Sequence, residues 1–572
     1  MARGKENKKM LWWLSAVILL VAINLFAARF HQRFDLTQEQ KYSLSGPTKE
    51  LLRNLQAPVT IDVFLTGKEM PAVVRKFKNS LNDFLVEAKE YSRNNLRYQF
   101  INPYESVMDT AAIRSMEDSL YSHYGLYPAV MNAPDKVGDK LEINKLIHGA
   151  VVHYGDKTAG IDLLKGAKSF GTDPEQLAVL YNNIEASIEY KFASAIQKIT
   201  AVKKPLVAYA TGNGEAWGYN ADDAIRTLIE AYDFDTLNIP QVPYIPEQAA
   251  ALVILKPTIP FKDAEKLKID QYIMHGGKVF WAIDNMYAEF DSLYKSQGFI
   301  AFDRGLNLED ILFNYGARLN QVLLQDMQSD QLPQVGGKGE TQQQRLVNWP
   351  FFPILNGTDH PITKNLDGVR SLFPTTVDTV ESSGIKKTVL LQSSNNSRLL
   401  SAPAKIDFEF LQIAPDEKLF TAKHIPVALL LEGSFRSLYT GRVPRAMADS
   451  LQAMNVPFAS KSSNTKMIIV ADGDIALNQF SQSTGPLPMG TNVFTRYTYA
   501  NKDFFVNSME YLVNPTDILQ TRSKEYSLRL LDAKKVEAEK LKWQLINIAL
   551  PVLLVVIFGF FYQQLRRRKY AV

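Results

Sequence analysis

Three aspartates stand where the sequence predicts the carboxyl ends of strands. Asp284 ends the run KVFWAID (278–284), and Asp472 and Asp474 lie in ADGD, directly after the apolar run TKMIIV. Ligands of α/β proteins bind at the carboxyl edge of the sheet. Carboxylates two residues apart are suited to a hard cation such as Mg²⁺ or to a sugar nucleotide. The pattern is compatible with a metal-dependent hydrolase or transferase, although Asp-Gly is also a common turn pair.

A second candidate site is the glycine-rich run GNGEAWG (212–218), which follows an apolar strand. A dinucleotide-binding turn has the spacing GxGxxG and an acidic residue at the end of the next strand. Here the spacing is GxGxxxG, and the next predicted strand, FDTLNI (234–239), ends in Asn238 and Ile239. The run therefore favours a tight turn between a strand and a helix over a nucleotide site.

Other catalytic groups lack the spacing that their chemistry needs. The chain has no cysteine, which excludes disulfides, thiolate metal sites and cysteine nucleophiles. Its seven histidines form neither HExxH nor an i,i+4 pair: His31, His123, His148, His153, His275, His360 and His424. No GxSxG elbow and no Walker-type GxxxxGK[ST] run is present. We therefore assign no catalytic, metal or cofactor-binding residue, predict that the chain is not an enzyme, and expect any ATP hydrolysis to come from a partner.

The arginine-containing run GSFRSLYTGR (433–442) has two interpretations. It is typical of a solvated surface loop. The alternative is a contact with an anionic partner.

The aspartates and the glycine-rich run belong to a region, 201–500, in which strands and helices alternate. Continuous apolar strands of this kind indicate a parallel sheet covered on both faces. Strands are predicted at 204–211, 234–239, 250–257, 278–284, 425–435 and 465–474, and helices at 222–232 and 263–276. Within the region, the polar and glycine-rich segment 326–349 is predicted to be a loop.

A smaller α/β domain is predicted over residues 34–200, linker helices included. VTIDVFLTG (59–67), a helix-periodic segment (71–93) and LRYQFINP (96–103) form a βαβ unit, and residues 144–164 form a hairpin around GDKTAG. This order is that of a thioredoxin-like domain. No CxxC motif is present, so no redox role follows.

Two uncharged apolar segments, 10–28 and 543–565, bracket these domains. Each is long enough, at 1.5 Å rise per residue, to cross a hydrocarbon layer of about 30 Å. The first segment is alternatively a cleaved signal peptide, and the second a buried core helix. A charged helical stalk, 501–542, is predicted to lead into the second span.

The charge distribution orients these spans. Residues 1–9 carry +3, Arg29 +1 and residues 566–569 +4, which leaves −4 of the net +4 for residues 30–542. The positive-inside rule then places the tails 1–9 and 566–572 in the cytoplasm and the bulk of the chain outside it, in the periplasm of a double-membraned cell. Because the exported bulk is slightly acidic, a nucleic-acid partner is not expected.

Several runs resemble a known family. RFDLTQEQKYSLSGPTKELL, the GNGE turn, KIDQYIMHGGKVFWAID and LLLEGSFRSLY resemble the GldG family of gliding-motility ABC-transporter auxiliary proteins. The resemblance implies an inner-membrane subunit that works with a permease, GldF, and an ATPase, GldA, with two copies per complex. It also implies that the larger domain has a class I glutamine-amidotransferase-like fold. The cysteine that such amidotransferases use is missing, so the resemblance implies a binding scaffold.

The sequence therefore leaves three hypotheses. The first is a non-enzymatic, membrane-anchored periplasmic subunit that couples permease and ATPase to a periplasmic substrate or partner. The second is a metal-dependent hydrolase or transferase that uses Asp284, Asp472 and Asp474. The third is a ligand-binding module for which the membrane helices are only tethers.

Overall fold

The structure is a computed structural model that divides the chain into two compact units, Met1–Lys524 and Glu525–Val572. It describes residues 12, 13, 15, 17–21, 24, 43–67, 70–105, 109–132, 143–164, 174–201, 203–296, 298–336, 343–408, 415–443, 457–514, 518, 519, 521 and 533–570.

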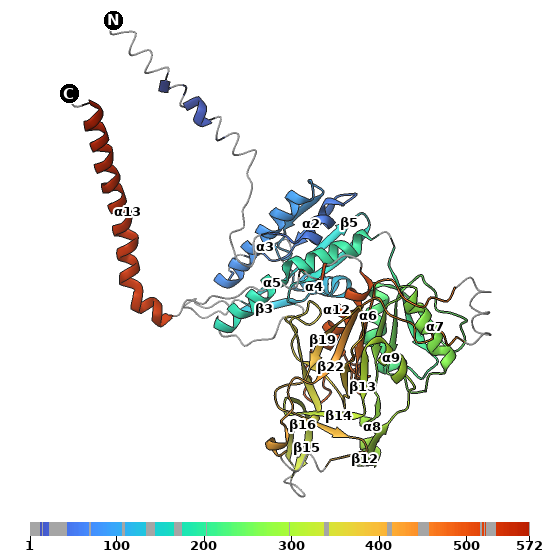
Figure 1. The fold of residues 1–572 in the computed structure, drawn as a ribbon. Coiled ribbons are helices and arrows are strands. Elements are labelled where there is room, and N and C mark those ends of the chain that lie inside the picture. The colour runs from blue at the N-terminus through green and yellow to red at the C-terminus, as the bar shows by residue number, and fades with distance from the viewer. Residues whose placement is uncertain are drawn as a thin grey trace. The chain divides into compact units, whose positions relative to one another are not determined.

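The amino-terminal part of the first unit is built on a four-stranded sheet with the order β2-β1-β5-β6 (Figure 1). β1 runs parallel to β2 and antiparallel to β5, which forms a hairpin with β6. The predicted βαβ unit and hairpin are therefore present, whereas the thioredoxin-like class stays a prediction. The strands are β1 (Val59–Val63), β2 (Leu96–Phe100), β5 (Gly149–Tyr154) and β6 (Lys157–Asp162), with a separate pair β3 (Pro128–Asn132) and β4 (Ile143–Ile147).

Helices pack on this sheet as the apolar spacing predicts. In α2, the hydroxyl of Ser45 caps the helix by accepting the N–H of Thr48, and Pro47 stands in the first turn. The helix α3 buries Val74, Phe77, Leu81 and Leu85, which recur at helical spacing. The helices are α2 (Gly46–Arg53), α3 (Ala72–Tyr91), α4 (Thr110–Tyr124) and α5 (Pro174–Thr200).

The larger part of the first unit contains a ten-stranded sheet, in which the order of the main path is β15-β16-β19-β22-β23-β10-β9-β7-β8. The strands β23, β10, β9, β7 and β8 are parallel, and β22 and the strands beyond it are antiparallel. The parallel strands are β7 (Leu206–Thr211), β8 (Asp233–Asn238), β9 (Ala249–Leu255), β10 (Val279–Ala282) and β23 (Thr465–Val470). The others are β15 (Ser329–Gly336), β16 (Gln343–Gly357), β17 (Val369–Arg370), β19 (Ile385–Gln392) and β22 (Pro426–Gly433).

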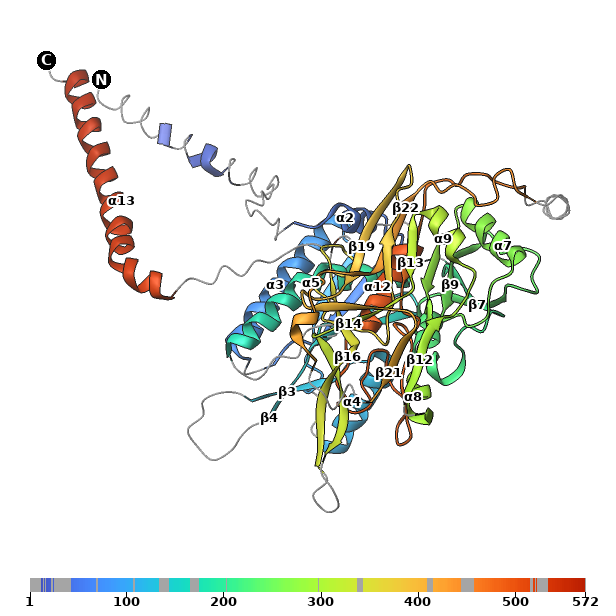
Figure 2. The ribbon, with the colours of Figure 1, turned by 60° about the horizontal axis from the view of Figure 1, so that its bottom comes forward.

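The structure corrects three details of the sequence prediction. The run 425–435 joins the sheet antiparallel to its neighbour, so the sheet is mixed. The segment 326–349 is largely a β-hairpin of β15 and β16, which extend from the sheet together in Figures 1 and 2. Residues 501–513, predicted to start a stalk, form α12 (Asn501–Val513), which packs across β9, β10 and β23.

Burial explains why these segments form the centre of the fold. All residues of β10 are buried, as are most of β9 and β23, because a sheet covered on both faces requires continuous apolar strands. On one face, Phe505 of α12 meets Phe280 of β10 with their ring centroids 5.3 Å apart. Further helices are η1 (Gly218–Asn220), α6 (Asp222–Ala231), α7 (Asp263–Met274), α8 (Phe290–Ser296), α9 (Glu309–Tyr315) and η3 (Glu417–Leu419).

The remaining strands form small sheets around a second, aromatic core. Trp349, Phe351, Phe352 and Phe373 are buried together, and Phe290 packs against them. The strands are β11 (Met286–Tyr287), β12 (Gly298–Asp303), β13 (Ala317–Asn320), β14 (Val322–Asp326), β18 (Thr376–Thr379), β20 (Ser397–Ser401), β21 (Ala404–Asp407), β24 (Phe480–Ser481) and β25 (Gly485–Pro486).

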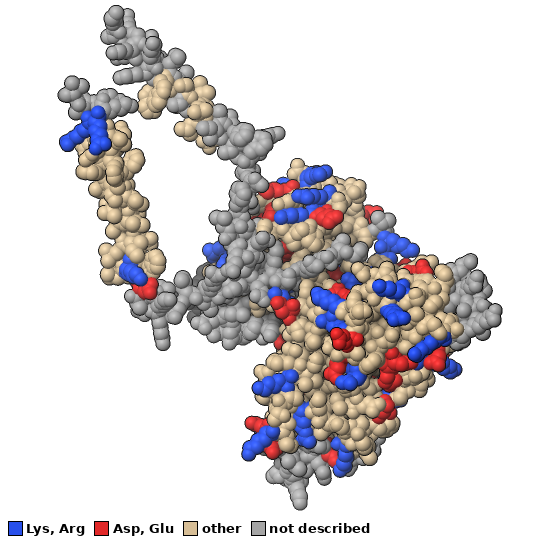
Figure 3. Space-filling model, in the orientation of Figure 1, with Lys and Arg blue, Asp and Glu red and all other residues tan. Residues whose placement is uncertain are grey.

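The second unit contains the helix α13 (Ala533–Tyr570), which is long and apolar enough over Glu539–Arg568 to cross a membrane. Its surface between the charged ends shows no Lys, Arg, Asp or Glu in Figure 3. This matches the predicted span 543–565. Of the first predicted span, 10–28, the described residues 12, 13, 15, 17–21 and 24 are helical, and the rest lie outside the described residues.

Candidate functional site

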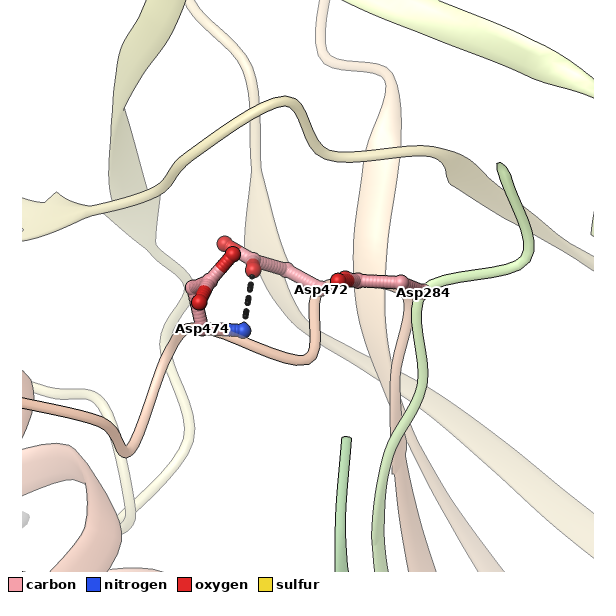
Figure 4. A group of neighbouring side chains, drawn as sticks. All are labelled: Asp284, Asp472 and Asp474. Atoms are coloured by element: carbon pink, nitrogen blue, oxygen red, sulfur yellow. Dashed lines mark hydrogen bonds between the residues drawn. The ribbon is translucent and has the colours of Figure 1, made fainter. Parts of the chain in front are cut away.

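The three aspartates that the sequence places at the carboxyl ends of strands lie together. Asp284 follows β10, and Asp472 and Asp474 follow β23, the neighbouring parallel strand (Figure 4). One oxygen from each carboxyl group lies within 4.8 Å of the others. Asp472 also organises the turn, because its Oδ1 accepts the backbone N–H of Asp474 at 2.7 Å. Each aspartate therefore follows a strand, as the sequence predicts, and the pairing of β10 with β23 brings the three together.

The cluster already contains a cation, the ammonium group of Lys256 at the end of β9. Its Nζ lies 2.7 Å from both oxygens of Asp474 and 3.2 Å from Asp284 Oδ2, where the two groups form an ion pair. A third carboxylate, that of Glu289, lies 3.0 Å away. An ammonium group in this position balances the carboxylates as a metal ion would, so a metal would have to displace it.

The backbone conformation near Lys256 allows its side chain to lie close to the carboxylates. Lys256 has a φ of 48°, in the left-handed region that side chains other than glycine rarely adopt. Opposite it, Gly473 donates its N–H to Asp284 Oδ1. A Cβ atom at Gly473 would lie 2.8 Å from Lys256 Cγ and 2.9 Å from Asp284 Cγ. Only glycine therefore allows the two loops to approach this closely.

A second cation, Arg304, completes the charge network from the other side. Its Nη2 donates to Glu289 Oε1 at 2.5 Å and lies 3.9 Å from Asp284 Oδ2. Glu289 thus links Lys256 to Arg304. Asp472 is held separately, because its Oδ2 accepts the hydroxyl of Ser371 and the N–H of Leu372.

The protonation states follow from burial and charge together. Burial works against the charged form of Lys256, but the three carboxylates outweigh it and hold the lysine pKa well above its usual value. Burial raises the pKa of Asp474 to about 6, against the opposing effect of Lys256. Burial and the neighbouring Asp474 and Asp284 raise the pKa of Asp472 well above its usual value. Lys256 therefore stays charged and is a poor nucleophile or general base.

The charge network forms one side of a pocket of about 790 Å³ at the carboxyl edge of the sheet. Lys256, Glu289 and Asp474 line it, together with Trp217, Phe290 and Phe480. The pocket lies next to β7, which has β8 on one side and β9 on the other. Connections from such a strand diverge to opposite sides of the sheet, and α/β proteins bind ligands at that point.

The glycine-rich run forms the tight turn that its sequence indicates. Gly212, Gly214 and Gly218 all have positive φ angles, of 108°, 72° and 82°. Asn213 donates its N–H to Glu215 Oε2 at 2.8 Å and its Nδ2 to Glu265 Oε2 at 2.9 Å. The polar side chains of the turn thus stabilise the conformation of the loop through hydrogen bonds. Trp217, at the end of the loop, lines the pocket.

The run 433–442 packs against α7 through a buried aspartate. Asp270 accepts the hydroxyl of Ser437 at 2.6 Å and the N–H of Leu438 at 3.0 Å. Arg436 and Arg442 are exposed, as the surface-loop interpretation predicts. Two of the runs that carry the family resemblance, KIDQYIMHGG and LLLEGSFRSLY, therefore meet in the fold at Asp270.

Among the described residues, the histidines do not join the acidic cluster. His148 is buried with its Nε2 2.6 Å from the hydroxyl of Tyr181, and burial lowers its pKa to about 4. His31 lies outside the described residues.

Sequence reasoning missed the cations of the site. Lys256 ends the apolar run AALVILKP, and a lysine at the carboxyl end of a central strand is a usable signal. Glu289 and Arg304 lie 5 and 20 residues after Asp284 and carry no recognisable spacing. Arg370, which also lines the pocket, comes from β17, a two-residue strand that no periodicity predicts.

Comparison with known proteins gives two family matches. A family described as an ABC-type uncharacterized transport system, of auxiliary type, matches residues 204–508, and a domain of unknown function matches residues 38–153. No curated protein matches the chain. A solved structure titled mmIFT52 N-terminal domain is similar at 10% identity and a TM-score of 0.28, covering 54% of this chain and 97% of that one. This TM-score is too low to support an argument about the fold.

The first match covers the whole parallel part of the sheet, both aspartate-bearing loops, Lys256 and most of α12. It also spans more than half of the 572 residues. The chain therefore belongs to the auxiliary family of this ABC-type transport system.

Proposed function

We propose that the chain is a non-enzymatic, membrane-anchored subunit of an ABC transporter complex, with its α/β domains outside the cytoplasm. Membership of the auxiliary family supports an association with a transporter, and α13 supports membrane attachment. In this proposal both termini are cytoplasmic, and the segments 10–28 and 543–565 pack against permease helices in the inner membrane.

The observation that carries the non-enzymatic part is the position of Lys256. It lies in a cluster of carboxylates that would otherwise suit a metal, and its charge is held by three ion pairs. A hydrolase or transferase based on Asp284, Asp472 and Asp474 would need those oxygens free for a cation. With Lys256 in place, the charge network has a structural role and maintains the shape of the pocket.

We further propose that the complex is the gliding-motility transporter, with GldF as permease, GldA as ATPase and two copies of this chain. The support is the resemblance of RFDLTQEQKYSLSGPTKELL, KIDQYIMHGG and LLLEGSFRSLY to the GldG family, of which the last two pack together at Asp270. Loss of surface spreading in a deletion strain, restored by the intact gene, tests this assignment.

The assembly test compares the full chain with one in which residues 543–565 are replaced by an unrelated apolar helix. Permease and ATPase co-purify with the full chain if the proposal is correct. Equal recovery with the replaced helix would show that the span is only a tether, as in the ligand-binding-module hypothesis. Function retained in the Asp472→Asn/Asp474→Asn double variant would eliminate the metal-dependent enzyme.

A further inference from the structure

The pocket beside Lys256 has the size and place of a ligand site. Its volume of about 790 Å³ lies within the roughly 300–1,000 Å³ of small-molecule sites. Segments that follow β7, β9, β11 and β23 line it, at the edge where parallel sheets bind ligands. A non-enzymatic role leaves the pocket without an assigned occupant.

The charges of the pocket favour a cation. Three acidic residues line it, Glu289, Asp291 and Asp474. Three cations stand against them. Lys256 is shared among Asp474, Glu289 and Asp284, Arg304 pairs with Glu289, and the charge of Arg370 is balanced by the buried Asp330. With Asp284 counted, four carboxylates therefore face the two cations Lys256 and Arg304. A ligand with a positive charge would complement the excess of carboxylates.

The aromatic lining favours an organic cation over a metal ion. Phe290 and Phe480 line the pocket with Trp217, which is 57% exposed. Aromatic faces attract ammonium and guanidinium groups but supply no ligand atoms to a metal. The place between Asp284 and Asp474, which a metal would need, is filled by Lys256 Nζ.

Arg370 adds a donor that nothing in the described part of the chain satisfies. Its side chain is only 4% exposed, and its Nε donates to Asp330 Oδ2 at 2.5 Å. Its Nη2 is buried without a hydrogen-bond partner. A buried guanidinium donor left unpaired is costly, and an oxygen acceptor on a ligand would satisfy it. Arg370 lines the same pocket as Glu289 and Asp474.

We propose that this pocket binds an amino-acid-like ligand, with its cationic group towards Glu289 and Asp474 and a carboxylate or carbonyl oxygen towards Arg370. A free basic amino acid and a basic peptide segment share this chemistry. The aromatic side chains of Trp217, Phe290 and Phe480 flank the cation. The inference goes beyond the accessory role and does not depend on which complex the chain joins.

The test is calorimetric titration of the full chain in detergent with L-lysine, the tripeptide Gly-Lys-Gly, putrescine, sodium acetate and MgCl₂. L-Lysine or the tripeptide is expected to bind more tightly than putrescine, which lacks the acceptor, and acetate, which lacks the cation. Binding of the tripeptide alone identifies a peptide segment as the source, and binding of both identifies a free amino acid. Permease and ATPase are not needed, so failure here leaves the assembly proposal standing.

Two variants and one matched control test the contribution of individual pocket residues. Trp217→Ala removes an exposed ring and is expected to weaken binding about five- to tenfold, the size of a cation–π contact. The matched control Phe313→Ala removes a ring that is 52% exposed on α9 and lines no part of this pocket, so it should leave affinity unchanged. Glu289→Gln should weaken L-lysine binding but not acetate binding. No binding of any lysine probe up to about 10 mM, or equal affinity in Trp217→Ala, overturns the proposal.

Discussion

Replacing Lys256 by methionine tests the charge network directly. Methionine retains an unbranched apolar chain as far as the Cε position but lacks the ammonium group, whose Nζ lies 2.7 Å, 3.0 Å and 3.2 Å from oxygens of Asp474, Glu289 and Asp284. The lysine side chain is 11% exposed, so solvent screens these charges little. Leaving buried charges without a partner costs about 3–5 kcal/mol. We expect the midpoint of thermal unfolding of the larger α/β domain to fall by about 5–8 °C.

Two controls separate charge from packing. Lys256→Arg retains a positive charge and should lose less stability than Lys256→Met. Lys405→Met removes a lysine that is 71% exposed and pairs with Asp407 at 2.6 Å, and it should cost no more than about 1 kcal/mol. The assay is thermal unfolding of full-length protein in detergent, followed by near-UV circular dichroism at pH 8.

The Lys256→Met variant should also acquire a response to divalent cations. Without the ammonium group, the oxygens of Asp284, Asp472 and Asp474, within 4.8 Å of one another, are open to Ca²⁺. Calcium at a hundred times its dissociation constant would restore about 2.7 kcal/mol, and the wild-type chain should gain none. A methionine variant as stable as the wild type at pH 8, or an equal response of both chains to calcium, would refute the assignment of Lys256 as the internal cation.

Three further predictions concern the same unit. The pKa of Asp474 is raised from 3.8 to about 6, so its contribution to stability is fully present below about pH 4 and is lost as pH rises through 6. Asp474→Asn should reduce this loss of stability in a plot of unfolding free energy against pH between about 4 and 7. Gly473→Ala places a Cβ 2.8 Å from Lys256 Cγ and should cost about 1–3 kcal/mol, measured by denaturant unfolding, whereas Gly46→Ala, with open space around it and no positive φ, should cost less. Glu510→Ala removes the acceptor for Ser194 Oγ at 2.9 Å and for the hydroxyl of Tyr190. The Glu510→Ala substitution should lower the free energy of unfolding by about 1–3 kcal/mol and speed amide hydrogen exchange in α5. Unchanged exchange in α5 would contradict a stabilising contact between Glu510 and that helix.

The parallel strands were predictable because burial on both faces leaves a direct mark on the sequence. The run AAALVIL of β9 is almost wholly apolar, and the same is true of VFWA in β10. The positions of Asp284, Asp472 and Asp474 at strand ends followed from it, whereas the pairing of β10 with β23, which brings them together, is a long-range contact. The cap at Ser45 was predictable for a similar reason, because it depends only on residues close in sequence.

Long-range contacts account for what could not be predicted. The hairpin of β15 and β16 contains Pro333 and many polar residues, so its periodicity is that of a loop, although Leu332 and Trp349 are buried in the aromatic core. The helix α12 was assigned to a stalk because a charged segment follows it, whereas Phe504 and Phe505 fix it on the sheet. Lys256 could be seen in the sequence, but the three carboxylates around it come from residues 28 to 218 positions further along the chain.

The most direct test of the accessory role is co-purification from native membranes. The chain carries an affinity tag and is solubilised under mild conditions, and the proteins bound to it are identified by mass spectrometry. The proposal predicts a permease and an ATPase in constant ratio to the chain, both lost when residues 543–565 are replaced by an unrelated apolar helix. Recovery of the chain without either protein, under conditions that keep other membrane complexes intact, would contradict it.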